Sequence, residues 1–340
     1  MNIAYFLDSS DPISPYRAIR LLKEELEKDG HKVVIFTPGH TRKGVEKKNG
    51  DYKVRFAFLE QGYNLSIPMV AISKLKQVLK AEEIDLVHSF SIGKMGGLAR
   101  EAAKSMEIKM FYTFLVNPYF GNPLLDKLVK KYLDWLLKYG EIIFPTELSQ
   151  KIVGIEADYV LPLPISYPKE VEEKRKKYII SAGKLTKDKN LSWLINALPS
   201  LINVDPSIKY KIYGKGEEEK NLKALIKQLG LNGNVTISYQ TDLSKAYQKA
   251  QVYYHASSKS LYSLSMMEAM SYGVVPLVYK DSAMRDVGLK DTIFEDKKDL
   301  THVVPRIMEQ YEELRERARF IAQAYDIKNL IQEYKHVYSV

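Results

Sequence analysis

The chain has 340 residues, contains no cysteine and carries a formal net charge of +9. This length suits two domains better than one, and the composition, 45% hydrophobic and 27% charged, indicates a globular protein. Without cysteine, disulfides, thiolate metal sites and cysteine nucleophiles are excluded. The six histidines lack zinc-site spacing, so we expect no metal site. The net positive charge favours anionic partners, but it does not distinguish between nucleic acid, phosphorylated ligands and anionic membranes.

Strand-like and helix-like stretches alternate through the first half of the chain. The predicted strands cover residues 2–7, 32–37, 52–58, 85–89, 109–114 and 141–145. The predicted helices cover residues 15–29, 70–83, 94–106 and 123–139. Ser14 before Pro15 is typical of a helix N-cap followed by a first-turn proline, and Gly30 is typical of a helix stop. This alternation predicts a parallel α/β sheet with crossover helices.

A proline-rich run followed by charges, LPLPISYPKEVEEKRKKY, begins at residue 161. It fits either a linker or a solvated loop, and the alternating pattern restarts after it, which favours a domain boundary. We therefore predict an N-terminal domain over residues 1–164 and a C-terminal domain over residues 165–324. A last helix at about residues 325–340 is expected to pack back on the first domain.

The second half repeats the α/β pattern. Its predicted strands cover residues 178–182, 209–213, 234–239, 252–256 and 274–279. Its predicted helices cover residues 190–203, 217–229, 243–249 and 263–272, with two more after residue 297. The predicted fold class is thus α/β, with two doubly wound domains and a cleft between them. Ligands of such sheets bind at the carboxyl ends of the strands.

Two strand-to-helix turns of the second half carry residues that suit an anion. Gly183 ends one strand, and Lys184 and Lys189 precede the next helix. Lysines beside a helix N-terminus can bind an anion, although a solvated basic loop fits the same residues. Gly214 and Gly216 flank the following turn, where a G-x-G on its own is also typical of a plain strand-to-helix connection.

The third stretch is SKSLYSLSMMEAMSYGVVP, residues 258–276. Ser265 and Glu268 have the spacing of a capping box, in which the acid would only satisfy a backbone amide. The alternative is that Glu268 accepts hydrogen bonds from ribose hydroxyls beside a helix N-terminus that faces a diphosphate. Gly273 is expected to end the helix, with Pro276 beyond it.

The pieces GKL…KN, GKG and SLYSLSMMEAMSYGVVP, in this order, resemble the nucleotide-sugar half of glycosyltransferase family 4. That family has the GT-B architecture of two Rossmann-like domains. The stretch DLVHSFSIGKMGGLAREAAKSMEIKMFYTF is most similar to bacterial glucosyl-diacylglycerol synthases. The resemblance implies transfer of a sugar from a UDP-sugar donor to a lipid or glycolipid acceptor at the inner membrane face, with retention and without a metal or other cofactor.

The resemblance also assigns site residues. It implies that Lys184 and Lys189 stabilise the leaving diphosphate as catalytic residues. It places the nucleotide-sugar against Gly183, Gly214, Gly216, Ser260, Leu261, Ser263, Leu264 and Glu268. The acceptor is expected to enter past Ser14, Leu115 and Asn117.

The segment NPLLDKLVKKYLDWLLKYG has leucines at helical spacing among lysines and aromatics. A basic amphipathic helix can lie in a membrane interface through Lys127, Lys130, Lys131 and Trp135. A core-facing helix with a solvated lysine face is the alternative. The N-terminus is typical of a strand and not of a signal peptide, and no apolar run approaches 18 residues. We therefore expect a cytoplasmic protein, with peripheral attachment to the inner membrane face as the second possibility.

Four positions depart from the family pattern. Ser260 stands where the family has a glutamate, Leu115 where it has a histidine and Lys184 where it has an arginine, and residues 13–15 replace a Gly-Gly loop. Two hypotheses stay open: an active transferase, or a catalytically degenerate GT-B protein that partners an active glycosyltransferase. We expect no nucleic-acid partner, because the basic residues are interleaved with acids and no nucleic-acid-binding motif is present.

Overall fold

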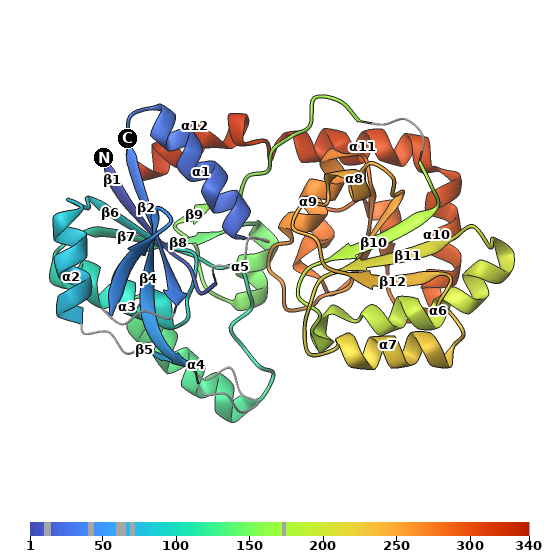
Figure 1. Ribbon diagram of the computed structural model, residues 1–340, viewed down its shortest axis with the longest axis horizontal. Coiled ribbons are helices and arrows are strands. Elements are labelled where there is room, and N and C mark those ends of the chain that lie inside the picture. Colours follow the sequence, from blue (N-terminus) through green and yellow to red (C-terminus); the bar gives the residue numbers. More distant parts are fainter. Residues whose placement is uncertain (10–14, 40–43, 59–65, 69–71, 172–174, 340) are drawn as a thin grey trace. The chain divides into compact units, whose positions relative to one another are not determined.

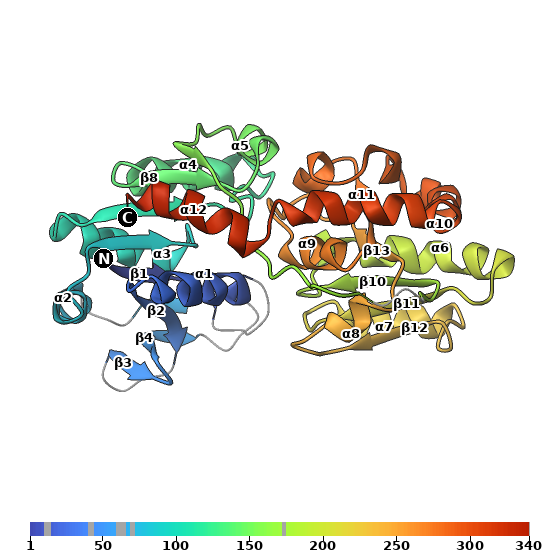
Figure 2. The same ribbon diagram turned by 90° about the horizontal axis from the view of Figure 1, so that it is seen from above.

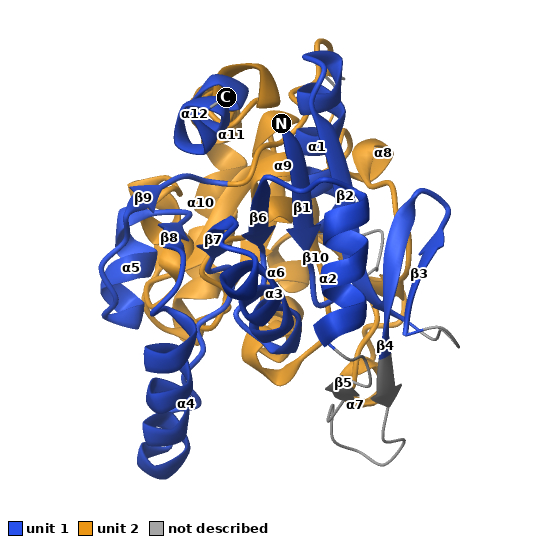
Figure 3. Ribbon diagram, turned by 90° about the vertical axis from the view of Figure 1, so that its left-hand side faces the viewer, with its two compact units in different colours: residues 1–12, 16–162, 331–340 blue, residues 13–15, 163–330 orange. Residues whose placement is uncertain are grey.

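The computed structural model describes residues 1–340 except 10–14, 40–43, 59–65, 69–71, 172–174 and 340 (Figure 1). The chain forms two compact units, each with its own sheet (Figure 3). Unit 1 comprises Met1–Pro12, Tyr16–Pro162 and Ile331–Val340, and unit 2 is chiefly Leu163–Leu330. The chain therefore enters unit 2 after Pro162 and returns to unit 1 after Leu330.

The sheet of unit 1 has the strand order β3-β4-β2-β1-β6-β7-β8-β9, with β5 paired to β4. The strands are β1 (Asn2–Phe6), β2 (Lys32–Gly39), β3 (Val45–Lys48), β4 (Asp51–Phe58), β5 (Ser66–Pro68), β6 (Leu86–Ser89), β7 (Lys109–Thr113), β8 (Glu141–Phe144) and β9 (Tyr159–Val160). Among the described strands of this sheet, β3 and β5 pair antiparallel with β4, and the other neighbours are parallel. The central strands β1 and β6 are buried almost throughout, and β6 carries the buried polar residues His88 and Ser89 at its carboxyl end.

The helices of unit 1 connect these parallel strands. They are α1 (Tyr16–Lys28), α2 (Ile72–Ala81), α3 (Lys94–Ser105), α4 (Pro123–Leu136), α5 (Glu147–Val153) and most of α12 (Ile327–Tyr338). Helix α4 begins where predicted, because the Asn122 side chain accepts from the amides of the first turn and Pro123 follows it. It ends at Leu136, three residues before the predicted end. Helix α5 was not predicted, and a capping box between Thr146 and Ser149 starts it.

A buried polar network joins α12 to the sheet of unit 1. The Nδ1 atom of His88 lies 2.6 Å from the Tyr338 hydroxyl, and Nε2 lies 2.7 Å from the Thr113 hydroxyl. The Tyr338 hydroxyl donates to that of Tyr5 at 3.3 Å, and the Tyr334 hydroxyl donates to the Pro162 carbonyl at 3.0 Å. Every polar group in this network has a partner, so α12 is held to the sheet by specific bonds as well as by apolar burial.

We expect unit 1 to lose stability as the pH falls below about 6.5, the ordinary pKa of histidine. Burial lowers the pKa of His88 to about 3. Between about pH 6.5 and about pH 3, His88 binds a proton in the unfolded chain and not in the folded one. The contribution of neutral His88 to the free energy of unfolding is therefore complete above about pH 6.5 and is lost progressively towards about pH 3. The measurement is the free energy of urea unfolding at several pH values.

The matched variants are His88→Gln, in the network, and His336→Gln, at an exposed position of α12. We expect His88→Gln to lower stability at neutral pH and to flatten the pH dependence. His336→Gln should leave both unchanged. An unaltered pH dependence in His88→Gln would contradict this account of His88.

Unit 2 has a fully parallel sheet in the order β12-β11-β10-β13-β14-β15. Its strands are β10 (Tyr178–Ala182), β11 (Lys209–Tyr213), β12 (Val235–Ser238), β13 (Val252–His255), β14 (Val275–Tyr279) and β15 (Ile293–Phe294). Counted from β10, this is the 3-2-1-4-5-6 order of a Rossmann sheet. The predicted class of two doubly wound α/β domains is confirmed.

The helices of unit 2 cover both faces of this sheet (Figures 1 and 2). They are α6 (Leu191–Val204), α7 (Glu219–Gln228), α8 (Ser244–Tyr247), α9 (Leu264–Ser271), α10 (Leu300–Glu309) and α11 (Tyr311–Gln323), with short 3-10 turns η1 (Lys187–Lys189), η2 (Ala283–Asp286), η3 (Lys290–Thr292) and η4 (Lys297–Asp299). Helices α6 and α7 pack together on one face, and α9 and α11 pack against each other and β14 on the other. Right-handed crossovers that leave β10 and β13 in opposite directions require this arrangement.

Candidate functional site

The strand order of unit 2 creates a topological switch point between β10 and β13. These strands are neighbours, but the chain leaves β10 towards β11 and leaves β13 towards β14. The loops after them, residues 183–190 and 256–263, therefore meet at the carboxyl edge of the sheet. The Asn190 side-chain amide donates to the Ala256 carbonyl at 2.9 Å, and the Tyr254 hydroxyl donates to the Asn190 carbonyl at 3.0 Å. Ligands of such sheets bind at this position.

Lys189 and Ser260 meet at this switch point. The Lys189 ammonium donates a 2.6 Å hydrogen bond to the Ser260 hydroxyl and lies 4.0 Å from an Asp188 carboxylate oxygen. Burial lowers the pKa of Lys189, and the Asp188 carboxylate opposes this shift. The lysine side chain keeps 26% of its surface exposed. A half-buried ammonium at a switch point is suited to bind an anion.

Asp188 is a site residue that sequence reasoning missed. Its carboxylate accepts from the Thr186 hydroxyl at 2.6 Å and from the Ser257 hydroxyl at 2.9 Å. Burial raises the pKa of Asp188, but the Thr186 hydrogen bond, the Lys189 charge and the Ser257 hydrogen bond together hold it below its usual value. Asp188 therefore stays ionised and ties the two loops together. A lone acid within the basic run KLTKDKN was the available signal.

Gly183, Gly214 and Gly216 shape the turn beside these residues. Gly183 has a φ of +135°, which side chains rarely adopt. A Cβ atom at Gly214 would lie 1.9 Å from the Gly183 carbonyl oxygen, and one at Gly216 would lie 2.2 Å from the Leu185 carbonyl oxygen. The G-x-G turn is thus required by close packing of two loop backbones. Lys184, on the same turn, is exposed and pairs with no carboxylate among the described residues.

Helix α9 begins one residue after Ser263, which is its N-cap. Ser265 therefore lies inside the first turn, where its hydroxyl donates to the Ala182 carbonyl at 3.1 Å, so the capping-box interpretation of Ser265 and Glu268 is wrong. Leu261 and Leu264, which flank this N-cap, are buried. The first amides of a helix lack helical partners and favour anions.

Glu268 is half-buried on α9, one turn beyond Ser265. Burial raises the pKa of Tyr253 to about 12, and the Glu268 charge acts in the same direction, so the carboxylate lies near that phenol. The Tyr253 hydroxyl donates to the Ala182 carbonyl at 3.1 Å, at the end of β10. Glu268 is thus placed beside the same strand end as Gly183.

Two of the predicted acceptor residues, Leu115 and Asn117, belong to unit 1. Leu115 and Asn117 are half-buried after β7, and the Asn117 side chain accepts from the Tyr119 amide at 3.0 Å. Ser14 lies outside the described residues. Sequence reasoning missed Asp8, which follows β1 at the switch point of the unit 1 sheet. Its carboxylate accepts from the Ser91 hydroxyl and from the Met95 amide.

Helix α4 projects from the rest of unit 1 (Figure 3). Leu124, Leu125 and Leu128 on it are 71%, 45% and 59% exposed, whereas only Leu133 and Leu136 are buried. Lys127, Lys130 and Lys131 are exposed beside the leucines. No helix among the described residues has both the length and the apolar character needed to cross a membrane.

Trp135 differs from the other predicted interface residues. The Arg100 guanidinium lies 4.4 Å from the centre of its ring, and Arg100 is itself buried and donates to the Leu136 carbonyl at 3.1 Å. The neighbouring Tyr132 hydroxyl donates to the Gly93 carbonyl at 2.9 Å. These contacts anchor the C-terminal half of α4 on α3, although Trp135 keeps 39% of its surface exposed, and the most exposed leucines lie at the N-terminal half.

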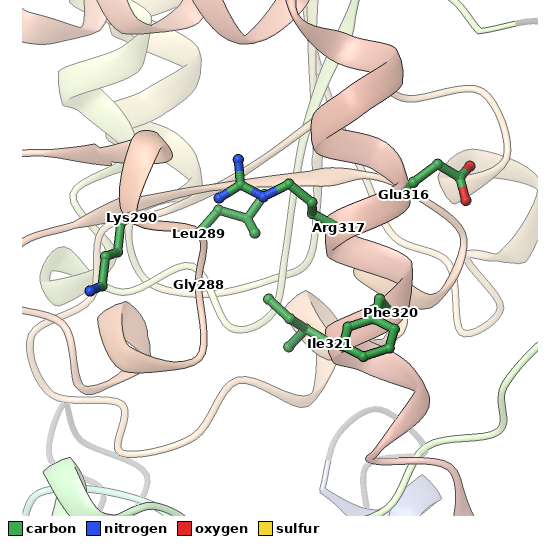
Figure 4. Close-up of a pocket in the computed structure, with 7 residues that line it drawn as sticks. All are labelled: Gly288, Leu289, Lys290, Glu316, Arg317, Phe320 and Ile321. Atoms are coloured by element: carbon green, nitrogen blue, oxygen red, sulfur yellow. The ribbon is translucent and has the colours of Figure 1, made fainter.

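Unit 2 also carries a shallow groove of about 550 Å³ (Figure 4). It lies between the segment around Leu289 and helix α11, where Phe320 is 79% exposed and Arg317 pairs with Asp291 at 2.8 Å. None of its lining residues belongs to the loops at the switch point. Among the described residues, no three His, Asp or Glu side chains are grouped so that they could hold a metal ion, and metal independence stays a prediction.

Two family models match the chain in succession. The model described as Glycosyltransferase Family 4 matches residues 17–153, and the model described as Glycosyl transferases group 1 matches residues 165–327. The chain is similar to the alpha-monoglucosyldiacylglycerol synthase of Streptococcus pneumoniae, at 22% identity over 86% of this chain and 74% of that protein.

Two further similarities are shorter or more distant. The GtfA subunit of the UDP-N-acetylglucosamine–peptide N-acetylglucosaminyltransferase of Streptococcus gordonii is 34% identical over 34% of this chain. The match spans only 22% of that relative's length. The crystal structure of Anabaena HepE in complex with UDP has the same fold, with a TM-score of 0.77 and 15% identity over 100% of both chains.

Proposed function

Because the chain belongs to the GT-B glycosyltransferases, with a family 4 N-terminal region and a group 1 C-terminal region, we propose that it transfers a sugar from a UDP-sugar to a lipid or glycolipid acceptor. The proposed reaction retains the anomeric configuration and takes place at the inner membrane face. The bond between the anomeric carbon and the diphosphate oxygen breaks, and the acceptor hydroxyl oxygen forms a bond to that carbon on the same face. The hydroxyl proton passes to the leaving diphosphate.

The observation that carries the donor half is the meeting of Lys189, Ser260 and the start of α9 at the unit 2 switch point. In the proposed complex the diphosphate replaces Ser260 as the main partner of Lys189. Lys184, which is exposed on the adjacent turn, adds a second positive charge. Preorganised cations and helix amides stabilise the leaving diphosphate most where its charge develops. Glu268 accepts from the ribose hydroxyls, and the absence of side chains at Gly183, Gly214 and Gly216 lets the nucleotide approach the backbone.

The acceptor half rests on different support. The synthase relative from Streptococcus pneumoniae is named for a lipid product, and α4 presents an apolar surface next to lysines. The choice of UDP rests on the resemblance of the donor motifs and on the UDP-bound HepE structure, which shares the fold. The test measures the thermal unfolding temperature of the chain at increasing concentrations of UDP. Stabilisation by UDP, absent with AMP, is expected, and no response to UDP would contradict the donor assignment.

A second candidate function is a catalytically degenerate partner of an active glycosyltransferase. Ser260 occupies the position of the family glutamate, and its hydroxyl is bonded to Lys189. Leu115, at the position of the family histidine, cannot form a hydrogen bond. The GtfA relatives are named as subunits, which fits a role in an assembly. Loss of one hydrogen bond to a sugar hydroxyl costs about 1–3 kcal/mol, so Ser260 on its own weakens sugar recognition without abolishing transfer.

The N-terminal half of α4 is the proposed contact with an anionic membrane surface. Leu124 and Leu128 lie four residues apart on one helix face, and Lys127 and Lys131 form the neighbouring stripe. Exposed leucines can enter the lipid interface while the lysines face anionic headgroups, each contributing about 1 kcal/mol. This arrangement favours a membrane interface over the core-facing alternative, because the leucines on this half are not covered by unit 1.

We expect the double substitution Leu124→Ser and Leu128→Ser to weaken binding to anionic vesicles about tenfold or more, because it removes apolar surface that enters the interface. Co-sedimentation with vesicles of phosphatidylglycerol and phosphatidylcholine measures this. Phe320→Ser is the matched control, since that ring is 79% exposed on unit 2. Equal loss in both variants, or no loss in the double variant, would contradict the assignment to α4.

A further inference from the structure

Tyr262 fastens the loop of residues 258–263, which we call the donor loop, to the segment by which the chain enters unit 2. It lies between Ser260 and Ser263, and its hydroxyl donates a 2.9 Å hydrogen bond to the Leu163 carbonyl. Both residues are buried, with exposures of 7% for Tyr262 and 0% for Leu163. Leu163 directly follows Pro162, the last residue of unit 1 before the crossing. The donor loop is thus bonded to the crossing itself.

The returning segment joins the same cluster. The Ile165 amide donates to the Tyr325 carbonyl at 2.8 Å, and the Ile327 amide donates to the Ile165 carbonyl at 2.9 Å. The rings of Tyr262 and Tyr325 have their centres 6.4 Å apart. The chain returns to unit 1 after Leu330, so Tyr262 contacts both segments that connect the two units. We call these segments, residues 162–165 and 325–330, the crossing segments.

The backbone at Leu163 is stiff. Proline rings precede and follow it in the sequence Pro162-Leu163-Pro164. Each ring fixes its own φ, and a residue before proline is confined to extended conformations. The Leu163 carbonyl therefore cannot swing independently of its neighbours, so a movement of the crossing segment is passed to the Tyr262 hydroxyl.

At its other end the donor loop is bonded to the anion site. The Ser260 amide donates to the Ser257 hydroxyl at 3.2 Å, and that hydroxyl donates to Asp188. The Ser260 hydroxyl accepts from Lys189 at 2.6 Å. The Tyr262 hydrogen bond, the backbone from Tyr262 to Ser260 and the Ser260 hydrogen bond therefore link Leu163 to the Lys189 ammonium.

We propose that Tyr262 is a positioning residue that makes the donor loop and the two crossing segments move as one body. A change in the crossing segments would then shift Ser260 and alter the geometry around Lys189. The catalytic meaning of this coupling rests on the proposed function. The mechanical coupling itself is tested without any donor.

The experiment compares Tyr262→Phe with Tyr311→Phe by amide hydrogen exchange of the ligand-free chain. Tyr311 is the matched control, because its buried hydroxyl also donates to a carbonyl of unit 2, that of Gly273, at 3.0 Å. Loss of one buried neutral hydrogen bond corresponds to about a five- to tenfold change in a local equilibrium. We expect the amides of Ser260, Ile165 and Ile327 to exchange faster together by about this factor in Tyr262→Phe and to be unchanged in Tyr311→Phe.

Faster exchange at Ser260 alone, at the crossing segments alone, or equally in both variants would overturn the coupling. A kinetic comparison adds a readout that a purely structural role would not move. With a UDP-sugar, Tyr262→Phe should lower kcat about five- to tenfold with little change in KM, because the loop binds but is misplaced. Absence of turnover in the unsubstituted chain would contradict the proposed function as an enzyme, and the exchange comparison would still decide the coupling.

Discussion

Lys189→Ala is expected to lower kcat/KM for sugar transfer by about 10²–10³, the usual effect of removing one preorganised group that stabilises developing charge. The Lys189 ammonium is half-buried at the switch point, with Ser260 and Asp188 as its neighbours. A leaving diphosphate placed there loses its nearest fixed cation in this variant. UDP binding should weaken as well, because the product carries the same diphosphate. The measurements are steady-state kinetics with a UDP-sugar and calorimetric titration with UDP.

The matched control is Lys187→Ala, two residues away on the same turn. Lys187 is exposed, and among the described residues its side chain forms no hydrogen bond or ion pair with the donor loop, so its loss should change both quantities by no more than about twofold. Thermal unfolding of each variant separates loss of function from loss of fold. If Lys189→Ala retained full transfer, or if Lys187→Ala were equally impaired, the assignment of the diphosphate to Lys189 would be wrong.

Gly214→Ala is expected to lower the free energy of unfolding of unit 2 by about 1–3 kcal/mol or more and to abolish UDP binding. The added Cβ would lie 1.9 Å from the Gly183 carbonyl oxygen, a backbone atom with no freedom to rotate away. Relief requires the two loops to separate, which displaces Gly183 and Lys184 together. Chemical denaturation followed by fluorescence measures the first effect, and UDP titration at a temperature where the variant is folded measures the second.

Gly233→Ala supplies the control for this substitution. A Cβ atom at Gly233 meets nothing within 4 Å, so the same chemical change is made in unit 2 without a clash. It should leave stability and UDP binding nearly unchanged. Full UDP affinity in Gly214→Ala would show that the close approach of the two loops is not needed for the site.

The alternation of apolar strands and amphipathic helices was enough to predict both doubly wound sheets. A central strand such as β1 is buried on both faces, so a continuous apolar run predicts it. The short strands β3, β5, β9 and β15 were not predicted. They have only two to four residues each and depend on pairing with β4, β8 or β14, which no local pattern encodes.

The candidate site was predicted as separate stretches, and their contacts came from the fold. The sequence placed Lys189 and Ser260 in different loops, and the strand order brings them within hydrogen-bonding distance. Asp188 was overlooked because its role depends on Ser257, which is 69 residues away. The capping box at Ser265 failed because the bond from its hydroxyl to Ala182 is a tertiary contact.

Trp135 illustrates the same limit in unit 1. An aromatic residue on a basic amphipathic helix is typical of a membrane interface, so the sequence grouped Trp135 with Lys127, Lys130 and Lys131. The ring also packs over the buried guanidinium of Arg100, which comes from α3, while 39% of the Trp135 surface stays exposed, so its place in a membrane interface stays a prediction. Only the tertiary structure separates the anchored half of α4 from the exposed half.

The most direct test of the central claim is a transfer assay with the full chain, a panel of UDP-sugars and membrane lipids that include diacylglycerol and glycolipids. The assay follows UDP release and glycolipid formation in the same reaction. The proposed function predicts formation of a glycolipid with one UDP released for each sugar transferred, and loss of both signals in Lys189→Ala. UDP binding without transfer from any donor to any lipid would contradict the enzyme and leave the degenerate partner as the function of this chain.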